Sequence, residues 1–390
     1  MVGKMKIVFA GGGTGGHIYP GIAVADELSR IAREQGRECQ IYWIGNNSGM
    51  DKNIVEKFLI PSDTKESVSD SSKSITKFYG IPCGKLRRYF SIKNFFDVFK
   101  IVFGLIKSFF LLLKIKPDFV FSKGGFVSVP PCMAAKFLHI PYFTHECDAT
   151  PGLATRLNAK GAKNILVSYD DTINMLSSGY RKKSIKTGNP VRPVFFKDSS
   201  QKGKEFLNIS DSNKKPVVLV LGGSLGALQV NNLIAENINQ ITKDFIVVHQ
   251  TGRTYAKENP DRMQITDSYK PFEFIYDEMP SVIQAADIII SRAGANSICE
   301  CSACGKPMIL VPLCGSGTRG DQVDNAKVFE KQGAAYVLMG EDVNGTKLME
   351  YLNNLKDVNT RKQFAENSKK LTGNINPATT IAQLILNEVK

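Results

Sequence analysis

The sequence predicts an α/β protein of two Rossmann-like domains, each with a parallel sheet covered by helices. Apolar runs typical of strands alternate with helix-like stretches along the 390-residue chain, a pattern that favours parallel sheets. A strand also runs directly into a glycine cluster and a helix at two places, in MKIVFAGGGTGGHIYP and in VVLVLGGSLGALQV. Because the chain is much longer than one domain of about 150 residues, we expect each half to carry one of these loops.

Both glycine loops have the chemistry of an anion site. Glycine adopts positive φ and lets the backbone approach a ligand closely, and the following helix directs its N–H groups and positive dipole end at the same point. Thr14 and His17 supply polar side chains in the first loop, and Ser224 supplies a hydroxyl in the second. A plain strand-to-helix turn would explain one such loop, but two loops favour phosphate or nucleotide binding.

Ten apolar runs are predicted as strands, five in each half of the chain. The first five are KIVFA, QIYWIG, DFVFS, PYFTHE and NILVS, and the second five are VVLVLG, FIVVHQ, FEFIY, DIIIS and PMILVP. The segment from Asn46 to Gly80 is rich in Ser, Lys and Asp, which predicts a surface loop region. Within it, Ser62 to Ser74 suggests no particular role.

Two prolines and a polar run mark the domain boundary. Pro190 and Pro193 interrupt regular structure, and DSSQKGK follows them, so the boundary is predicted between Arg192 and Lys202. A final helix is predicted to start at Pro377, where proline suits the first helical turn. We therefore expect domains at 1–195 and 196–370 and a C-terminal helix within 371–390.

The eight cysteines are scattered, and no signal peptide precedes the first predicted strand, so a reducing cytoplasm is expected. Cys299, Cys301 and Cys304 lie close together. They lack the second cysteine pair of a zinc site and fall in a helix-like stretch. We therefore expect no metal and no cofactor.

Positive charge is concentrated in one segment. The net charge of the chain is +13, and residues 77–116 contain nine Lys and Arg against one acid, Asp97. This segment includes FFDVFKIVFGLIKSFFLLL, which predicts a helix with a narrow polar stripe formed by Asp97, Lys100, Gly104 and Lys107. Its charges argue against a membrane-spanning helix. It either lies on an anionic membrane surface or is buried in the first domain with its lysines reaching outward. No nucleic-acid module accompanies the charge, so nucleic acid is not expected as a partner.

Eight strings occur in the order and spacing of one known family. They are GGGTGGHIYPGIAVADEL, CGKLRRYFS, FSKGGFVSVP, HECDATPGLATRLNAK, TGNPVR, LGGSLGA, SRAGANSICE and DQVDNA. From Lys6 to about Leu338 the chain resembles the MurG family of GT-B glycosyltransferases. The resemblance implies two Rossmann-like domains whose parallel sheets face a central cleft, with the C-terminal helix returning to the N-terminal domain.

The resemblance also implies an activity and a location. MurG enzymes transfer N-acetylglucosamine (GlcNAc) from UDP-GlcNAc to the C4 hydroxyl of N-acetylmuramic acid (MurNAc) in undecaprenyl-pyrophosphoryl-MurNAc-pentapeptide (lipid I). The product is lipid II, a precursor of peptidoglycan that cell shape and division require. The implied location is peripheral, at the cytoplasmic face of the cell membrane, near other enzymes of cell-wall synthesis.

By the same resemblance, the C-terminal half binds UDP-GlcNAc. Ser224 faces the donor phosphates, Glu300 accepts hydrogen bonds from both ribose hydroxyls, and Gln322 reads sugar hydroxyls with Asn325 beside it. Arg192 lies close to the donor phosphate, although a surface arginine packed after a proline is the alternative. The uracil is bordered by the backbone of Ile275, Ala295, Asn296, Ser297, Ile298 and Cys299. The chain contains no Asp-X-Asp motif, so helix dipoles, Ser224 and Arg192 are expected to stabilise the leaving diphosphate.

The N-terminal half is expected to bind the acceptor. Gly11 to Gly16, including Thr14, Gly15 and Gly16 as substrate contacts, and Gly124 to Gly125 would cradle the lipid diphosphate. His17 is the first candidate for the base that deprotonates the acceptor hydroxyl, and the alternative is that it only binds the acceptor.

Other polar residues of this half have secondary roles. Glu146 is a second candidate acid or base, with His145 supporting its loop, and His139 and His249 are expected to be structural. The family's HEQNA reads HECDA here, so Asp148, a substrate-contact candidate, offers a carboxylate where the family has an amide.

Three other functions are compatible with parts of the pattern. A different lipid-directed GT-B transferase would lack GKLRRYFS and the HECDA region. A UDP-GlcNAc epimerase shares the two-domain architecture but needs no basic lipid-facing helix. A catalytically silent sugar-nucleotide-binding protein would not need His17, Glu300 and Gln322 together.

Overall fold

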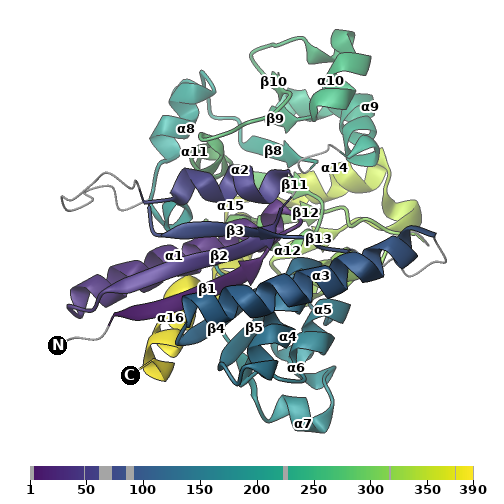
Figure 1. Ribbon diagram of the computed structural model, residues 1–390. Coiled ribbons are helices and arrows are strands. Elements are labelled where there is room, and N and C mark those ends of the chain that lie inside the picture. The colour runs from purple at the N-terminus through teal and green to yellow at the C-terminus, as the bar shows by residue number, and fades with distance from the viewer. Residues whose placement is uncertain are drawn as a thin grey trace. The chain divides into compact units, whose positions relative to one another are not determined.

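The computed structural model describes residues 4–47, 49–60, 73–84, 92–222, 227–315, 318–373 and 375–389. The chain forms two compact units. Unit 1 comprises Met1–Arg192 and Ile375–Lys390, and unit 2 comprises Pro193–Asn374. Each is an α/β unit built on one parallel sheet (Figure 1). The predicted fold class is therefore confirmed.

Unit 1 contains a seven-stranded sheet in the order β3-β2-β1-β4-β5-β6-β7. Its strands are β1 (Met5–Gly11), β2 (Cys39–Asn46), β3 (Lys77–Ile81), β4 (Phe119–Gly124), β5 (Tyr142–Glu146), β6 (Asn164–Val167) and β7 (Ser184–Lys186). Its helices are α1 (Gly15–Glu34), α2 (Met50–Val55), α3 (Ile92–Ile115), α4 (Val129–Phe137), α5 (Leu153–Asn158), α6 (Asp170–Asn174), α7 (Ser178–Arg181) and α16 (Pro377–Glu388), with 3₁₀ turns at Glu56–Phe58 and Phe126–Ser128.

The sheet of unit 1 is apolar on both faces, because helices cover both. Along β4, Phe119 and Phe121 enter the core on the side of α1 and α16, whereas Val120 enters the core on the side of α3 and α4. The C-terminal helix α16 packs against α1, as Figure 1 shows in yellow beside the purple helix. Its return to the N-terminal unit confirms that expectation. Asn376 caps α16 by accepting from the Ala378 N–H at 3.0 Å.

The long helix α3 exposes several of its large apolar side chains. Phe95, Phe103 and Phe110 are each more than 60% exposed. On the side that faces the unit, Leu112 and Ile115 enter the core, but this side also carries polar and small residues, and Asp97 is 6% exposed. A side chain on Gly104 would collide with the Pro82 carbonyl, so glycine lets α3 pack closely on that segment. The predicted polar stripe is therefore wrong in part, because Asp97 and Gly104 face inward.

Unit 2 contains a six-stranded sheet in the order β10-β9-β8-β11-β12-β13. Its strands are β8 (Val217–Leu221), β9 (Ile246–Gln250), β10 (Tyr269–Phe272), β11 (Ile288–Ser291), β12 (Met308–Leu310) and β13 (Ala335–Val337). Its helices are α8 (Ser200–Phe206), α9 (Leu228–Asp244), α10 (Arg253–Glu258), α11 (Met279–Ala285), α12 (Ala295–Ala303), α13 (Asp321–Lys331), α14 (Gly345–Asn354) and α15 (Val358–Thr372), with 3₁₀ turns at Pro193–Phe196, Pro260–Met263 and Gly340–Asp342.

Several short elements differ from the predictions. The strand expected in FEFIY lies earlier, at β10, an edge strand that tolerates Pro271 because its N–H side needs no partner. The edge strands β3, β7 and β13 were not predicted, since three to five residues give little periodicity. The loop expected from Asn46 to Gly80 contains α2 and most of β3, and Pro61 to Ser72 lies outside the described residues.

Both sheets reverse their strand order at the first strand. In unit 1 the reversal lies at β1, between β2 and β4, and in unit 2 it lies at β8, between β9 and β11. Ligands of open α/β sheets bind at the carboxyl ends of the strands beside such a reversal. The first glycine loop and Gly222, where the second loop begins, therefore lie at the expected ligand positions. Among the described residues, no helix has the length and apolar character to cross a bilayer.

Candidate active site

The first glycine loop is shaped by a buried carboxylate that the sequence did not single out. Asp51, at the start of α2, is 1% exposed and accepts from the Gly13 N–H at 2.8 Å and from the Asn46 N–H at 2.8 Å. Burial raises the pKa of Asp51. A side chain on Gly12 would collide with this carboxylate, so glycine is required there.

Thr14, Gly15, Gly16 and His17 lie where the loop enters α1. Thr14 is exposed at the N-cap, where its side chain makes no capping hydrogen bond. Gly15 and Gly16 are the first residues of the helix. The first N–H groups of a helix have no partner within it, so this turn presents donors and the positive dipole end to an anion.

The two glycine loops of unit 1 meet at His17. A Cβ on Gly125 would lie 2.6 Å from the His17 Cδ2 atom, and Gly125 has φ +75°. Gly124 has φ +88° and lies against the His145 carbonyl. The structure thus brings His17 together with Gly124 and Gly125. Glycine is needed at both of these positions, because the backbone conformation and the limited space exclude a side chain.

Glu146 organises its own loop. Its Oε1 accepts from the Asp148 N–H at 3.1 Å, and its Oε2 accepts from the Gly152 N–H at 2.8 Å and the Thr155 hydroxyl at 2.6 Å. The residue is 5% exposed. These bonds favour a structural role for Glu146 over acid or base chemistry.

Asp148, two residues further on, is half-buried. Its carbonyl accepts from the Thr172 hydroxyl at 3.5 Å. Ligand atoms of Glu146, Cys147 and Asp148 lie within 4.8 Å of one another, the grouping of potential metal ligands found in the described part of the chain. Since both Glu146 oxygens already accept hydrogen bonds, we assign no metal to them.

Two buried basic residues lie beside the loops. His145 Nε2 lies 2.9 Å from the Gly188 carbonyl, to which it donates as the neutral ring. Its pKa is lowered well below the usual value, first by burial and then by the charge of Lys123. Lys123, which ends β4 with Gly124, was also missed by sequence reasoning. It is 2% exposed.

Arg192 is the last residue of the first segment of unit 1. Its guanidinium carbon lies 5.1 Å from the centroid of the Tyr19 ring. Tyr19 belongs to the first turns of α1, so this cation–π contact places the arginine near the start of that helix.

In unit 2, β8 delivers the second glycine loop to α9. Gly222 is described, but Ser224 lies outside the described residues. Ile275, a uracil candidate, is 2% exposed, and its N–H donates to the Gln250 side chain at 2.9 Å. Of its two backbone polar groups, only the Ile275 carbonyl therefore remains available to a uracil base.

The other donor candidates lie on α12 and α13. On α12, Ala295, Ile298 and Cys299 are buried, Asn296 and Glu300 are half-buried and Ser297 is exposed. Asn296 and Glu300 share one face, four residues apart. On α13, Gln322 Oε1 accepts from the Leu313 N–H at 2.9 Å, which leaves its amide nitrogen to donate. Asn325 is fully buried and donates to the Ala293 carbonyl at 3.2 Å, a structural bond that supports the start of α12.

Two further polar groups of unit 2 are structural. His249 contacts the Asn231 side chain and the Tyr269 hydroxyl, both at 3.1 Å, and burial lowers its pKa to about 3. Arg292, which sequence reasoning missed, donates to Gln229 and to the Val311 carbonyl, both at 2.9 Å. No short sequence motif distinguishes such an arginine from a ligand-binding one.

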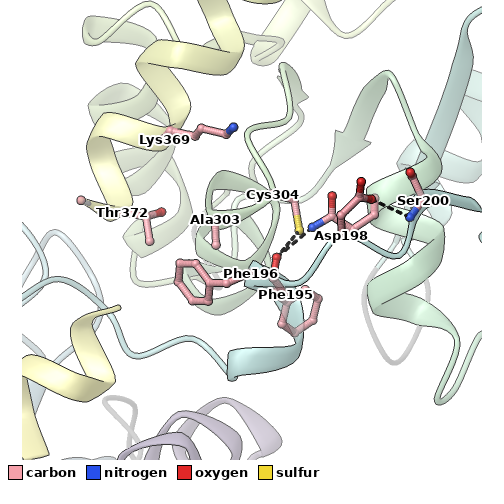
Figure 2. Close-up of a pocket in the computed structure, with 10 residues that line it drawn as sticks. Phe195, Phe196, Asp198, Ser200, Ala303, Cys304, Lys369 and Thr372 are labelled. Carbon is pink, nitrogen blue, oxygen red and sulfur yellow. Dashed lines mark hydrogen bonds between the residues drawn. The ribbon is translucent and has the colours of Figure 1, made fainter. Parts of the chain in front are cut away.

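A cavity of about 610 Å³ lies elsewhere in unit 2. Figure 2 shows the Cys304 thiol donating to the Phe195 carbonyl at 3.3 Å, and the Asp198 carboxylate accepting from the Ser200 N–H at 2.9 Å. Burial raises the pKa of Cys304 to about 12, so its thiol stays protonated. The cavity lies at the C-terminal end of α12, whereas the donor candidates lie toward its N-terminal end. We therefore assign it no part in the active site.

Comparisons with known proteins identify the family of the chain. The glycosyltransferase family 28 N-terminal domain matches residues 7–167, and the family 28 C-terminal domain matches residues 217–385. The chain is 49% identical to a UDP-N-acetylglucosamine–N-acetylmuramyl-(pentapeptide) pyrophosphoryl-undecaprenol N-acetylglucosamine transferase of Treponema denticola, over 97% of this chain and 96% of that protein. It is 38% identical to the transferase of the same name from Clostridium tetani, over 94% and 93% of the two chains.

Solved structures show the same fold. MurG of Acinetobacter baumannii superimposes with a TM-score of 0.69 at 23% identity, over 99% of this chain and all of that one. The UDP-GlcNAc 2-epimerase of Neisseria meningitidis superimposes with a TM-score of 0.64 at 16% identity, over 99% and 100%. Fold alone does not separate these activities, but the sequence relatives do. The chain belongs to glycosyltransferase family 28 and, within it, to the MurG family.

Proposed function

We propose that the protein transfers GlcNAc from UDP-GlcNAc to the C4 hydroxyl of MurNAc in lipid I, with inversion, to form lipid II for peptidoglycan synthesis. The observation that carries this proposal is the 49% identity, over 97% of the chain, to a transferase named for that sugar and acceptor. Likeness to the epimerase is limited to the fold, so it does not favour an isomerase.

The donor is proposed to bind unit 2. The exposed face of α12 offers Glu300 to the ribose hydroxyls, since a carboxylate can accept from both. The Ile275 carbonyl can accept from the uracil N–H, because the Ile275 N–H is already donated to Gln250. Gln322 presents an amide nitrogen to the sugar hydroxyls, as its oxygen holds the Leu313 N–H.

The acceptor and the base are proposed to belong to unit 1. The acceptor C4 oxygen attacks the anomeric carbon of GlcNAc while His17 takes the hydroxyl proton. The bond from the anomeric carbon to the β-phosphate oxygen breaks, and UDP leaves with the bonding electrons. Attack on the face opposite to UDP inverts the anomeric centre. Support for His17 over Glu146 comes from the Glu146 carboxylate, whose oxygens already accept three hydrogen bonds.

The leaving diphosphate is proposed to be stabilised without a metal. Helix N-termini, Ser224 and Arg192 provide the positive charge and hydrogen-bond donors that this departure requires. Arg192 is held over Tyr19, a contact that limits its rotamers before substrate binds.

We further propose that α3 places the protein on the cytoplasmic membrane surface, where its acceptor and other cell-wall enzymes reside. Phe99, Phe103 and Phe110 are exposed, and Lys100 and Lys107 are exposed among them. A helix with apolar side chains facing solvent and cationic groups beside them suits an anionic bilayer interface. A soluble helix would normally show the opposite arrangement.

The test is UDP release from UDP-GlcNAc by the purified protein, with and without a lipid I analogue and in the presence of EDTA. The proposal predicts release that requires the acceptor and persists in EDTA. Conversion of the donor without acceptor would indicate an epimerase, and no release under any condition would reject the transferase.

A further inference from the structure

Lys123 is a buried cation whose charge no group in the described part of the chain neutralises. It is 2% exposed, and its Nζ has no hydrogen-bond partner there. Burial of an unpaired ammonium is costly, so proteins normally pair such a group or avoid it. Two buried carboxylates of the site make other hydrogen bonds, since Asp51 accepts from backbone N–H groups and Glu146 accepts from the Gly152 N–H of its own loop.

Lys123 lies where open α/β sheets bind their ligands. Ala10 pairs with Ser122 and Gly11 with Gly124, so Lys123 lies at the carboxyl ends of β1 and β4, where the strand order reverses. Its Cβ lies 3.4 Å from the point where a Gly11 side chain would begin. The first glycine loop and Gly124 to Gly125 flank it on either side.

The imidazole beside Lys123 adds no negative charge. His145, whose pKa is lowered first by burial and then by the charges of Lys123 and His17, is neutral, and its Nδ1 atom is also buried without a partner among the described residues. The first turn of α1 directs further positive potential toward the loops. Lys123 therefore remains a buried positive charge that an anion would neutralise.

Unit 2 provides an internal comparison. Its β8–β11 pair matches Leu221 with Ser291, as the β1–β4 pair matches Ala10 with Ser122, so Arg292 occupies the position that corresponds to Lys123. Arg292 donates to Gln229 and to the Val311 carbonyl. The cation of unit 2 is thus satisfied by its own unit, whereas the cation of unit 1 is not.

We propose that Lys123 is the fixed charge that positions the diphosphate of the acceptor at the two glycine loops of unit 1. This inference rests on the proposed function. Backbone N–H groups of the loops contact the phosphate oxygens, and Lys123 attracts them from beneath through a low-dielectric interior. Lys123 is therefore a positioning residue, and its unpaired state lowers stability in exchange for acceptor binding.

The experiment compares wild type with Lys123→Met and with the exposed control Lys160→Met, which removes the same charge from the same unit. Thermal unfolding is measured with and without inorganic pyrophosphate, at saturating UDP so that the donor site is occupied. Steady-state kinetics with a lipid I analogue give KM for acceptor and donor separately.

We expect Lys123→Met to raise the acceptor KM about tenfold or more, as loss of a charge-assisted contact implies, with the donor KM unchanged. The pyrophosphate-induced rise in Tm should disappear in this variant and persist in Lys160→Met. The Tm without ligand should be equal to or above that of wild type, because an unpaired buried charge has been removed.

Three results would overturn the inference. One is an unchanged acceptor KM and pyrophosphate response, which would show that the anion binds elsewhere. Another is a lowered Tm in Lys123→Met and in a second neutral variant, Lys123→Gln, which would make Lys123 a structural cation. The third is that Lys160→Met raises the acceptor KM and loses the pyrophosphate response as much as Lys123→Met does. Failure of the proposed function is distinguishable, since wild type itself would then lack acceptor-dependent turnover.

Discussion

The two units share a strand order but carry different chemistry at the carboxyl ends of their strands. Unit 1 places His17, Lys123 and a neutral His145 there. Unit 2 places backbone groups, the Gln322 amide and the Glu300 carboxylate there. Under the proposed function, one scaffold binds an anionic substrate and accepts a proton, and the other binds the nucleobase and the sugar hydroxyl groups. The comparison shows that function follows from the side chains beyond each strand rather than from the fold.

Removal of the candidate base should produce the largest effect. His17→Ala is expected to lower turnover by about 10² to 10⁴-fold, the usual contribution of a general base. Without His17, no positioned group takes the proton from the hydroxyl of the acceptor substrate. Single-turnover kinetics measures this loss directly. His139→Asn is the control, since His139 has φ +57°, a conformation that asparagine tolerates. Normal turnover in His17→Ala would remove the residue from its role.

The contact between the two glycine loops should be the next most sensitive feature. Gly125→Ala adds a Cβ 2.6 Å from the His17 ring, and displacement of a catalytic group by about 1 Å can cost about 10²-fold in rate. Gly36→Ala is a matched control, because Gly36 also has positive φ but nothing lies within 4 Å of its Cβ position. If kcat falls equally in both variants, backbone strain rather than the His17 contact explains the loss.

In unit 2, Glu300→Gln should weaken binding of the donor UDP-GlcNAc and leave binding of the acceptor unchanged. Hydrogen bonds to a charged group contribute about 1.5–3 kcal/mol, so the KM for UDP-GlcNAc is expected to rise about 10 to 100-fold. Glu341→Gln, an exposed carboxylate of the same unit, serves as control. A rise in the acceptor KM instead would break the division of substrates between the units.

Sequence patterns predicted the helices and strands of this molecule better than the surroundings of its buried charged side chains. Strong alternation and long apolar runs located nine strands and α3, α12 and α16. They left open whether the apolar side chains of α3 face outward or are buried, since periodicity defines two faces but not which one is buried. Asp51 was missed because it acts on a loop 38 residues away. Lys123 and Arg292 look alike in sequence, and only their hydrogen bonds separate them.

The exposed face of α3 distinguishes unit 1 from unit 2 in a further way. Phe103→Ser with Phe110→Ser should weaken binding to anionic vesicles about tenfold or more, since each buried Phe contributes about 1.5–3 kcal/mol. Lys100→Glu with Lys107→Glu should weaken it less, and only at low salt. Ile265→Ser, which removes an exposed apolar side chain from unit 2, should change nothing. Vesicle co-sedimentation would contradict the surface assignment if all variants bind equally.

The smallest effect on turnover is expected at Asp26, a half-buried carboxyl of unit 1. Burial raises the pKa of Asp26 from 3.8 to about 7, while the Ser74 hydroxyl donates to it at 2.6 Å. Between pH 4 and pH 7, about the range of these two pKa values, the folded protein holds a proton on Asp26 that the unfolded chain has lost. This contribution to the free energy of unfolding therefore falls as pH rises from about 4 to about 7. Denaturant unfolding of Asp26→Asn should lack this decline, and an identical pH profile in the variant would refute the assignment.

The division of labour between the two units is tested most directly by calorimetric titration of UDP into wild type, His17→Ala and Glu300→Gln. We predict that His17→Ala binds UDP as wild type does although it barely turns over, whereas Glu300→Gln binds UDP about 10 to 100-fold more weakly. Equal loss of UDP affinity in both variants would contradict the assignment of donor binding to unit 2 and proton transfer to unit 1.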